Sequence, residues 1–368
     1  MVKPNPSVVR IGLVGAGYIA EEVHLPVLKS LDGVEVVAIC DLDLQKAQLI
    51  SRKFGVENVY ASLREMLESM NVDLVDICTP PKTHAALLIE ALQSEKDCLV
   101  EKPFTTTTEE ADEVIGLARS KSLHIFVLHN YSFLPATRNL AMLKKSGKLG
   151  EIVLVETRYL APLAKERYYS PTHWIHRLPA GVLNSEILPH LIMLVMDYMG
   201  FVESVKVASD KVSRLDYVSA DELSVILISQ STVAHVGLSF NSTMPLHSID
   251  IVGTKGVAHA DMFTQAVVYH RVPQYKGTDK LSYNVLTRGV WALTDVLQRI
   301  TSISSISINV ALGRYKPRVE GHRFLMVQCL SAIRNGTPYP ISLEVAREVV
   351  RLVEIIGRDV ESEATRPC

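Results

Sequence analysis

The amino-acid sequence predicts an α/β protein of two domains, in which a doubly wound parallel sheet is followed by a domain built on antiparallel strands. Apolar strands alternate with amphipathic helices from Val8 to Leu128, which is typical of a parallel sheet covered by helices. Beyond residue 130, several strand-like runs follow one another with short turns, which indicates antiparallel hairpins. A chain of 368 residues is long enough to form two hydrophobic cores.

The first connection between a strand and a helix carries a glycine-rich turn. A buried strand over 8–14 runs into Gly15, Ala16 and Gly17, and a helix begins near Ala20. Gly15 permits a sharp turn, Gly17 lets a pyrophosphate approach the backbone, and Ala20 is small enough for the helix to pack closely on the strand. Free N–H groups and the positive dipole end of that helix would hold the phosphates. The turn therefore predicts dinucleotide binding, with an ordinary structural turn as the alternative.

An acidic residue stands at the end of the second strand. The strand over 34–40 is followed by Asp41, 26 residues after Gly15, which is near the spacing of a carboxylate that binds ribose hydroxyls. Asp41 is followed by Leu42 and Asp43, and no Arg or Lys stands beside it. A 2′-phosphate would meet negative charge there, so the sequence favours NAD over NADP.

The remaining elements of the first domain continue the alternation, and polar residues stand where its strands end. Helices are predicted over 42–54, 63–70, 84–93 and 109–120, and strands over 58–60, 72–78, 98–100 and 124–128. Thr79-Pro80-Pro81 follows one of these strands, and Glu101-Lys102-Pro103 follows the next. Because ligands of such sheets bind at the carboxyl ends of the strands, these residues are candidates for a common site.

The second domain begins with a helix over 134–146 and a strand over 151–160. A loop over 161–178 and a mostly apolar helix over 186–198 precede strands over 202–208, 223–228, 233–240, 248–252 and 256–262, and amphipathic helices over 318–334 and 343–358 follow later. Within 276–313, Val285, Val290, Leu293 and Val296 indicate one apolar face on a helix over 281–300. A flap or a dimer contact is the favoured interpretation of this helix, and a helix on a membrane surface is the alternative.

Composition and charge argue against several classes of protein. The formal net charge is −2 and no cluster of Lys and Arg stands out. We therefore expect the protein to bind neither nucleic acid nor an anionic membrane surface. No run reaches the roughly 18 apolar residues of a membrane span, and residues 1–10 lack the apolar segment of a signal peptide. The five cysteines are scattered without a C-x-x-C motif, which fits reduced thiols in a cytoplasmic protein.

Motifs along nearly the whole chain resemble the Gfo/Idh/MocA oxidoreductase family, the group of glucose–fructose oxidoreductase and inositol dehydrogenase. The most diagnostic of them is Glu101-Lys102-Pro103 after a strand. The residues that carry the resemblance are Gly15-Ala16-Gly17-Tyr18-Ile19-Ala20, His24-Leu25-Pro26, Asp41, Thr79-Pro80-Pro81 with His84, Glu101-Lys102-Pro103, His129-Asn130 with Phe133 and Pro135, Gly150-Glu151-Ile152, His190, Gly253-Thr254-Lys255-Gly256 and Gly321-His322-Arg323-Phe324.

The resemblance implies an architecture and an assembly. An NAD(P)-binding Rossmann domain would occupy residues 1–129, and a domain for substrate binding and oligomerisation would occupy residues 130–368. The second domain would be built on a large, mostly antiparallel sheet, through which members commonly form homodimers or homotetramers. Many members have a cis peptide at the position of Lys102-Pro103.

The resemblance also implies roles at a site of alcohol oxidation. Such a reaction with NAD needs a base for the hydroxyl proton and a donor for the developing alkoxide. His190 would be the base, Lys102 would hydrogen-bond the reacting oxygen, and Glu186 would orient His190 or bind a substrate hydroxyl. The expected cofactor-binding residues are Gly15, Gly17, Tyr18, Ile19, Asp41, Thr79, Pro80, His84, Glu101, Lys102 and Asn130. The expected substrate-binding residues are Lys102, Tyr131, Arg158, Trp174, His176, Glu186 and His190.

One stretch departs from the family pattern of a glycine-rich turn followed by Asp, three residues and His. Here Glu186 replaces the Asp, Leu188 replaces a glycine, and the glycine run before His190 is broken. Glutamate is one methylene longer, so its carboxylate lies elsewhere or reaches a different partner. Pro189 lacks an N–H and fits only the first turn of a helix, so Glu186 is expected to precede the regular helix.

The expected function is that of an NAD(P)-dependent dehydrogenase acting on the CH–OH group of a sugar, cyclitol or related polyol. Two alternatives stay open: an NAD-dependent glycosidase-type enzyme on the same scaffold, and a non-catalytic NAD(P)-sensing regulator, against which Lys102 and His190 argue. Each of these two residues also has a structural interpretation, as a solvated lysine and a hydrogen-bonded core histidine. His173 and His176 have no further ligands at the usual zinc spacing, so no metal is expected.

Overall fold

The computed structural model describes residues 8–162, 186–214, 218–272, 280–312, 314 and 317–364. The chain forms two compact units. The first comprises residues 1–130 and 318–354, and the second comprises residues 131–317 and 355–368. The division after residue 130 lies one residue from the expected boundary, but residues 318–354 belong with the N-terminal unit rather than with the second domain.

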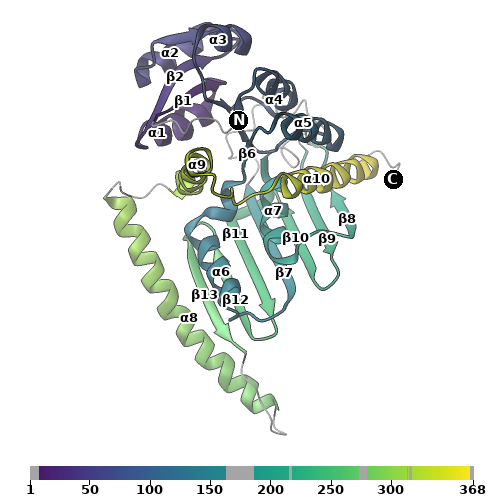
Figure 1. The fold of residues 1–368 in the computed structure, drawn as a ribbon. Helices are drawn as coiled ribbons and strands as arrows, with labels where there is room; N and C mark the ends of the chain where they lie inside the picture. The colour runs from purple at the N-terminus through teal and green to yellow at the C-terminus, as the bar shows by residue number, and fades with distance from the viewer. Residues whose placement is uncertain are drawn as a thin grey trace. The chain divides into compact units, whose positions relative to one another are not determined.

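The first unit is built on a six-stranded parallel sheet (Figure 1). Its strands are β1 (Val9–Val14), β2 (Val34–Cys40), β3 (Asn58–Tyr60), β4 (Leu74–Ile77), β5 (Asp97–Glu101) and β6 (Ile125–Leu128). The spatial order is β3-β2-β1-β4-β5-β6, so the chain reverses direction across the sheet between β1 and β4. This is the order of dinucleotide-binding sheets, which bind their ligand at that reversal.

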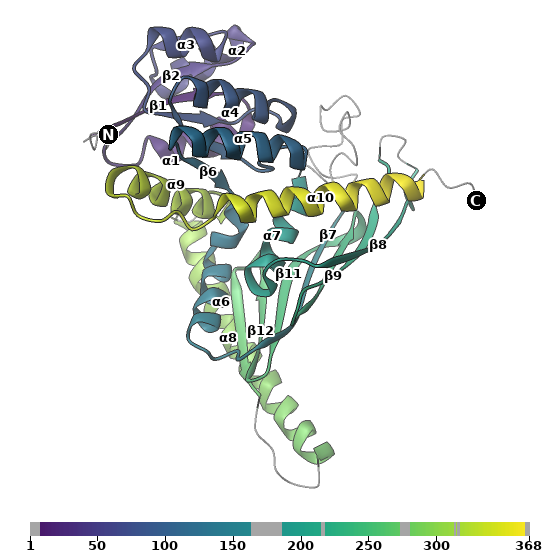
Figure 2. The ribbon, with the colours of Figure 1, turned by 45° about the vertical axis from the view of Figure 1, so that its right-hand side comes forward.

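Helices accompany the strands of this sheet. They are a π-helical turn (Ala20–His24), α1 (Leu25–Leu28), α2 (Leu44–Phe54), α3 (Leu63–Ser69), a 3-10 turn (Pro81–Thr83), α4 (His84–Gln93), α5 (Thr108–Lys121) and α9 (Pro317–Asn335). Figure 2 shows α4 and α5 side by side. α5 begins with a capping box, in which Thr107 accepts from the Glu110 N–H and the Glu110 carboxylate accepts from Thr107.

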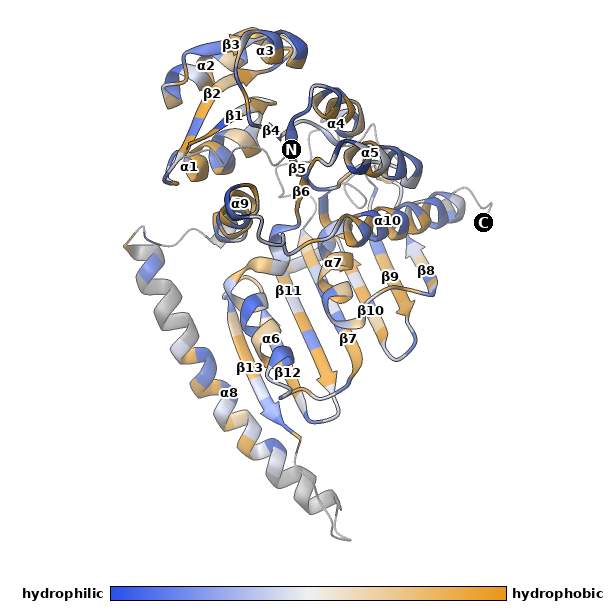
Figure 3. Ribbon diagram, viewed as in Figure 1, coloured by the Kyte–Doolittle hydropathy of each residue, from blue (hydrophilic) through white to orange (hydrophobic). Residues whose placement is uncertain are grey.

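The second unit is built on a seven-stranded sheet with the order β13-β12-β11-β7-β10-β9-β8. Its strands are β7 (Ile152–Pro162), β8 (Ser204–Asp210), β9 (Glu222–Ile228), β10 (Val233–Ser239), β11 (Asn241–Gly253), β12 (Gly256–Asp261) and β13 (Ala266–Arg271). Only the β7–β10 pair is parallel among the described strands of this sheet. Figure 3 shows hydrophobic residues concentrated on β7, β9 and β10.

Three helices accompany this sheet, namely α6 (Pro135–Lys145), α7 (Leu188–Met199) and α8 (Lys280–Ala311). α6 packs on β12 and β13 while α7 packs on β7 and β10, and α7 is buried over almost its whole length. α8 lies along β13, where the Trp291 ring stacks on His270 with centroids 4.5 Å apart. A further helix, α10 (Leu343–Ala364), contributes its residues up to Glu354 to the first unit.

The fold class predicted from the sequence is confirmed. Most predicted elements lie within a few residues of their observed bounds. Two differences stand out: β13 was not predicted, and the helix predicted over 281–300 continues to Ala311. None of the described helices combines the length and apolar composition that a membrane span requires.

Candidate functional site

The carboxyl ends of the parallel strands form one edge of the first sheet, and several predicted site residues follow these ends. Val14 at the end of β1 pairs with Ile77 of β4, and Ile77 pairs with Val100 of β5. The glycine turn, the loop over 79–81 and Lys102 therefore leave the sheet at the same edge. Doubly wound sheets bind their ligands at this edge.

Gly15 and Gly17 differ in what surrounds them. Gly15 has a φ of +99°, and a Cβ added to it would lie 2.9 Å from the carbonyl carbon and oxygen of Cys78. At Gly17 an added Cβ would meet no described atom within 4 Å. The turn thus packs tightly on the end of β4 and leaves open space at its second glycine, which fits the phosphates of a dinucleotide. Tyr18 (42% exposed) and Ile19 follow this space directly.

Asp41 stands just beyond β2, as predicted, and is bound to the glycine turn. Its Oδ2 accepts a hydrogen bond from the Ala16 N–H at 2.7 Å, and its Oδ1 accepts from the Asp43 N–H at 2.9 Å. The ammonium of Lys46 lies 3.9 Å from Oδ2. This carboxylate therefore holds the turn in place, and a lysine five residues further along the chain lies near it.

His84 connects the loop after β4 to the turn after β5. Its Nδ1 lies 2.8 Å from the Pro103 carbonyl oxygen, and its Nε2 lies 2.9 Å from the Thr79 carbonyl oxygen. Burial lowers the pKa of His84, so the neutral ring donates to one of the two carbonyls. The peptide between Lys102 and Pro103 is cis, as the resemblance implied. The buried ring of His84 thus lies between two loops at the candidate site and donates a hydrogen bond to one of them.

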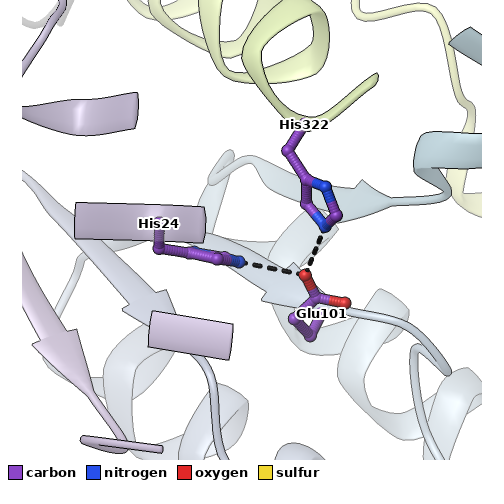
Figure 4. A group of neighbouring side chains, drawn as sticks. All are labelled: His24, Glu101 and His322. Atoms are coloured by element: carbon purple, nitrogen blue, oxygen red, sulfur yellow. Dashed lines mark hydrogen bonds and ion pairs between the residues drawn. The ribbon is translucent and has the colours of Figure 1, made fainter. Parts of the chain in front are cut away.

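Glu101 is buried between two histidines, as Figure 4 shows. Its Oε1 lies 2.9 Å from Nε2 of His24 and 2.9 Å from Nε2 of His322. Its Oε2 accepts from the backbone N–H of Lys102 at 3.2 Å. Both oxygens of the carboxylate are therefore bonded to groups of the protein itself.

The buried cluster around His24 carries charge. Nδ1 of His24 lies 2.8 Å from the Asp76 carboxylate and 3.1 Å from the Cys78 sulfur, and its Nε2 faces Glu101. Burial acts to lower the pKa of His24, but Asp76 and Cys78 together raise it well above its ordinary value. Burial likewise acts to raise the pKa of Glu101, yet His322 and His24 hold it well below its usual range. Burial raises the pKa of Cys78 to about 12, so this side chain is a thiol.

His129 and Asn130 follow β6 and are both buried. Neither ring nitrogen of His129 has a hydrogen-bond partner among the described residues. Burial, together with the charge of Lys102, lowers the pKa of His129 to about 4, so the ring is neutral. α9 packs against Asn130 so closely that a Cβ at Gly321 would collide with the Asn130 carbonyl oxygen.

In the second unit, the structure brings two predicted substrate-binding residues together. His190 lies in the first turn of α7 and stacks on Tyr131, with ring centroids 3.8 Å apart and planes inclined by 11°. The ring of His247 lies 5.3 Å from that of Tyr131, and burial lowers the pKa of His247 to about 4. Glu186 precedes α7, in agreement with the constraint that Pro189 imposes.

Arg158, another predicted substrate residue, does not join this group. Arg158 is exposed on β7 and forms an ion pair with Asp250 of β11, with an N–O distance of 3.5 Å. Its neighbour Thr157 is buried, and because side chains alternate along a strand, Arg158 projects from the opposite face. Trp174 and His176 lie outside the described residues.

Sequence reasoning missed the partners of Glu101. His24 and His322 stand in two motifs of the resemblance, His24-Leu25-Pro26 and Gly321-His322-Arg323-Phe324, but neither had a role there. Asp76 offered a signal of its own, since an ionisable residue in an otherwise apolar strand needs a buried partner.

Two family models match the chain. The first, described as an oxidoreductase family with an NAD-binding Rossmann fold, matches residues 9–129, and the second, the GFO/IDH/MocA C-terminal domain, matches residues 137–259. A dTDP-3,4-didehydro-2,6-dideoxy-α-D-glucose 3-reductase of Saccharopolyspora spinosa is 31% identical over 63% of this chain and 68% of its own length. D-glucoside 3-dehydrogenase of Escherichia coli is 30% identical over 42% of this chain, and the match spans only 44% of that protein.

Solved structures share the fold over nearly the whole chain. The WlbA dehydrogenase from Bordetella pertussis, solved with NADH and UDP-GlcNAcA, has a TM-score of 0.76 at 19% identity and covers 97% of this chain and 96% of its own. UDP-N-acetylglucosamine 3-dehydrogenase GnnA from Acidithiobacillus ferrooxidans has a TM-score of 0.72 at 20% identity and covers 97% of this chain and 99% of its own. These likenesses show the fold of the chain.

Proposed function

Because the chain belongs to the Gfo/Idh/MocA oxidoreductase family, we propose that it is an NAD-dependent dehydrogenase acting on a CH–OH group of a sugar, cyclitol or related polyol. One observation carries the proposal. The register of the first sheet places the open turn at Gly17 and the Glu101-Lys102-Pro103 turn at the same edge, separated in the sheet only by β4. A cofactor held at the turn would thus have a lysine within the same site.

NAD supplies a hydride acceptor when it is bound at this edge, and residues of the chain supply the rest of the chemistry. The Lys102 ammonium hydrogen-bonds the reacting oxygen and stabilises its developing negative charge. His190 takes the hydroxyl proton in the oxidation direction and returns it in the reverse direction. Tyr131, stacked on the His190 ring, holds the plane of that ring, and Glu186 orients the substrate or His190.

The preference for NAD over NADP rests on Asp41, whose carboxylate stands where a 2′-phosphate would be repelled. Lys46, 3.9 Å from that carboxylate, offsets only part of its charge because the lysine side chain is about half exposed. Turnover with NADP at the rate seen with NAD would contradict this preference. Both cofactors are therefore to be measured in parallel.

The test is a screen for NADH formation across sugars, inositols and sugar acids, followed by a substitution in the turn after β5. Lys102→Met should keep NAD affinity but lower turnover on the true substrate by about 100-fold or more, as loss of a donor to a developing oxyanion does in other enzymes. Lys121→Met, the same change at an exposed lysine of α5, is the matched control and should match the wild type.

The two alternative functions are outcomes of the same screen. Release of sugar without net NADH would indicate the glycosidase-type reaction. NAD binding with no product from any polyol, and no loss of function in Lys102→Met, would indicate a sensor.

A further inference from the structure

We propose that His322 of α9 is a positioning residue for Lys102, acting through the buried carboxylate of Glu101. The inference rests on the proposed role of Lys102 as the donor to the reacting oxygen. It gives a function to the His24–Glu101–His322 cluster, which consists of the three side chains drawn in Figure 4.

The turn that carries Lys102 begins where the sheet ends. β5 ends at Glu101, which pairs with Leu128 of β6, so Lys102 lies beyond the ladder that fixes the strand. The backbone N–H of Lys102 donates to Oε2 of Glu101, and the carbonyl of the next residue, Pro103, faces His84. A hydrogen bond therefore restrains the main chain at the start of this short turn, and the buried His84 ring lies against its end.

The hydrogen bond from the Lys102 N–H to Glu101 restrains the turn only as far as the Glu101 side chain is itself held in place. Its Oε1 is bonded to Nε2 of His24 on one side and Nε2 of His322 on the other, both at 2.9 Å. Hydrogen bonds to an ionised carboxylate are about twice as strong as bonds between neutral groups. Two such bonds from different elements fix the carboxylate plane, and with it the direction of Oε2 toward the Lys102 N–H.

The two histidines are not equivalent in this arrangement. His24 is also bonded to Asp76 and Cys78, so its removal would leave several buried groups without partners. His322 comes from α9 and reaches the cluster through its Nε2. Removing its donor nitrogen therefore loosens Glu101 while His24 and Asp76 keep their contact.

The experiment compares His322→Leu, which removes the donor, with His322→Gln, whose amide can still donate to Glu101. Misplacing a catalytic group by about 1 Å can lower the rate on the order of 100-fold, so we expect kcat of His322→Leu to fall about tenfold to 100-fold per NAD-binding site. The Kd for NAD and the KM for substrate should stay within a factor of about three, since neither ligand touches His322 in the proposal. His322→Gln should recover most of the lost kcat.

A second readout needs neither substrate nor turnover. The rate at which an amine-reactive anhydride acylates Lys102, measured by peptide mapping of the NAD-free protein, should change in His322→Leu and return toward the wild-type rate in His322→Gln. If His322→Leu does not fold, Glu101→Asp replaces it, because a side chain one methylene shorter cannot keep both histidines and the Lys102 N–H.

Cys329→Ala is the matched control. Cys329 lies seven residues further along α9 and is buried, and no hydrogen bond joins it to Glu101 among the described residues. It should lower the unfolding midpoint without lowering kcat per site. Equal losses of kcat in Cys329→Ala and His322→Leu, or a folded His322→Leu with wild-type kcat and Lys102 acylation, would overturn the proposal. Wild-type turnover by Lys102→Met would instead refute the proposed function, and the acylation rates would still decide whether His322 positions Lys102.

Discussion

Alanine substitutions at Gly15 and Gly17 separate what the glycine turn does for the fold from what it does for the cofactor. At Gly15 the positive φ costs about 1–3 kcal/mol for alanine. The contact at 2.9 Å with the rigid Cys78 backbone adds about 1–3 kcal/mol of overpacking. We therefore expect Gly15→Ala to lower the free energy of unfolding by about 2–6 kcal/mol, a large part of the roughly 5–15 kcal/mol typical of a domain.

Gly17→Ala should behave in the opposite way. No described atom lies within 4 Å of the added methyl group, so the free energy of unfolding should stay within about 0.5 kcal/mol of the wild type. The methyl group would occupy the space left for the pyrophosphate, and we expect the Kd for NAD to rise at least tenfold, or about 1.4 kcal/mol. Urea unfolding followed by circular dichroism measures the first quantity, and isothermal titration calorimetry measures the second.

Gly116→Ala on α5 is the control, because its added methyl group also meets no described atom within 4 Å and the position lies away from the turn. It should gain about 0.5–1 kcal/mol from helix propensity and leave NAD affinity unchanged. The reasoning is refuted if Gly15→Ala unfolds at the wild-type urea concentration, or if Gly17→Ala binds NAD with wild-type affinity.

Two further predictions concern buried titratable groups. The pKa of His129 is about 4 in the fold and about 6.5 when unfolded, so below pH 6.5 the unfolded chain binds a proton more readily, and the free energy of unfolding falls by roughly 3 kcal/mol as the pH falls to 4. In His129→Phe the free energy of unfolding, measured in urea at pH 7 and pH 4.5, should depend less on pH, and an unchanged dependence would contradict the burial of the ring. Burial also raises the pKa values of Cys40 and Cys78 to about 12, so iodoacetamide at pH 8 should leave both thiols unmodified until urea unfolds the chain, as peptide mapping would show.

The spacing of apolar residues along the sequence predicted most of the fold, because the same residues form the buried faces of the helices and strands. The strand over Val72–Cys78 and the helix over His84–Gln93 were recognisable from continuous apolar runs and helical spacing, and both were observed. β13 was missed because its pairing with β12 is a tertiary feature, which the local pattern of Ala266–Arg271 does not record. The end of α8 was missed because residues 302–308 consist only of Ser and Ile, although the helix propensities of these residues are unfavourable by only about 0.7 kcal/mol or less per residue.

Sequence motifs predicted the part of the candidate site at which a cofactor would approach the main chain. They were less informative where the position of a side chain depends on tertiary structure. Gly15 and Gly17 are required for different reasons, but both reasons follow from the absence of a Cβ. A glycine motif in the sequence shows that absence directly. Arg158 was a reasonable candidate by charge, yet the alternation along β7 places it on the face opposite the buried Thr157. A one-residue difference in register decides between the two faces of a strand, and the sequence of the loop before β7 does not specify that register.

The place of α9 follows from the charge of Glu101. A carboxylate at the end of a buried strand is unstable without partners, because its desolvation outweighs any single contact. One partner, His24, precedes it by 77 residues, and the other, His322, follows it by 221 residues, beyond the second unit. The chain must therefore return to the first sheet after building the second one, which explains why residues 318–354 belong to the N-terminal unit. No pattern within α9 carries this information, since the contact between His322 and Glu101 joins two segments far apart in the sequence.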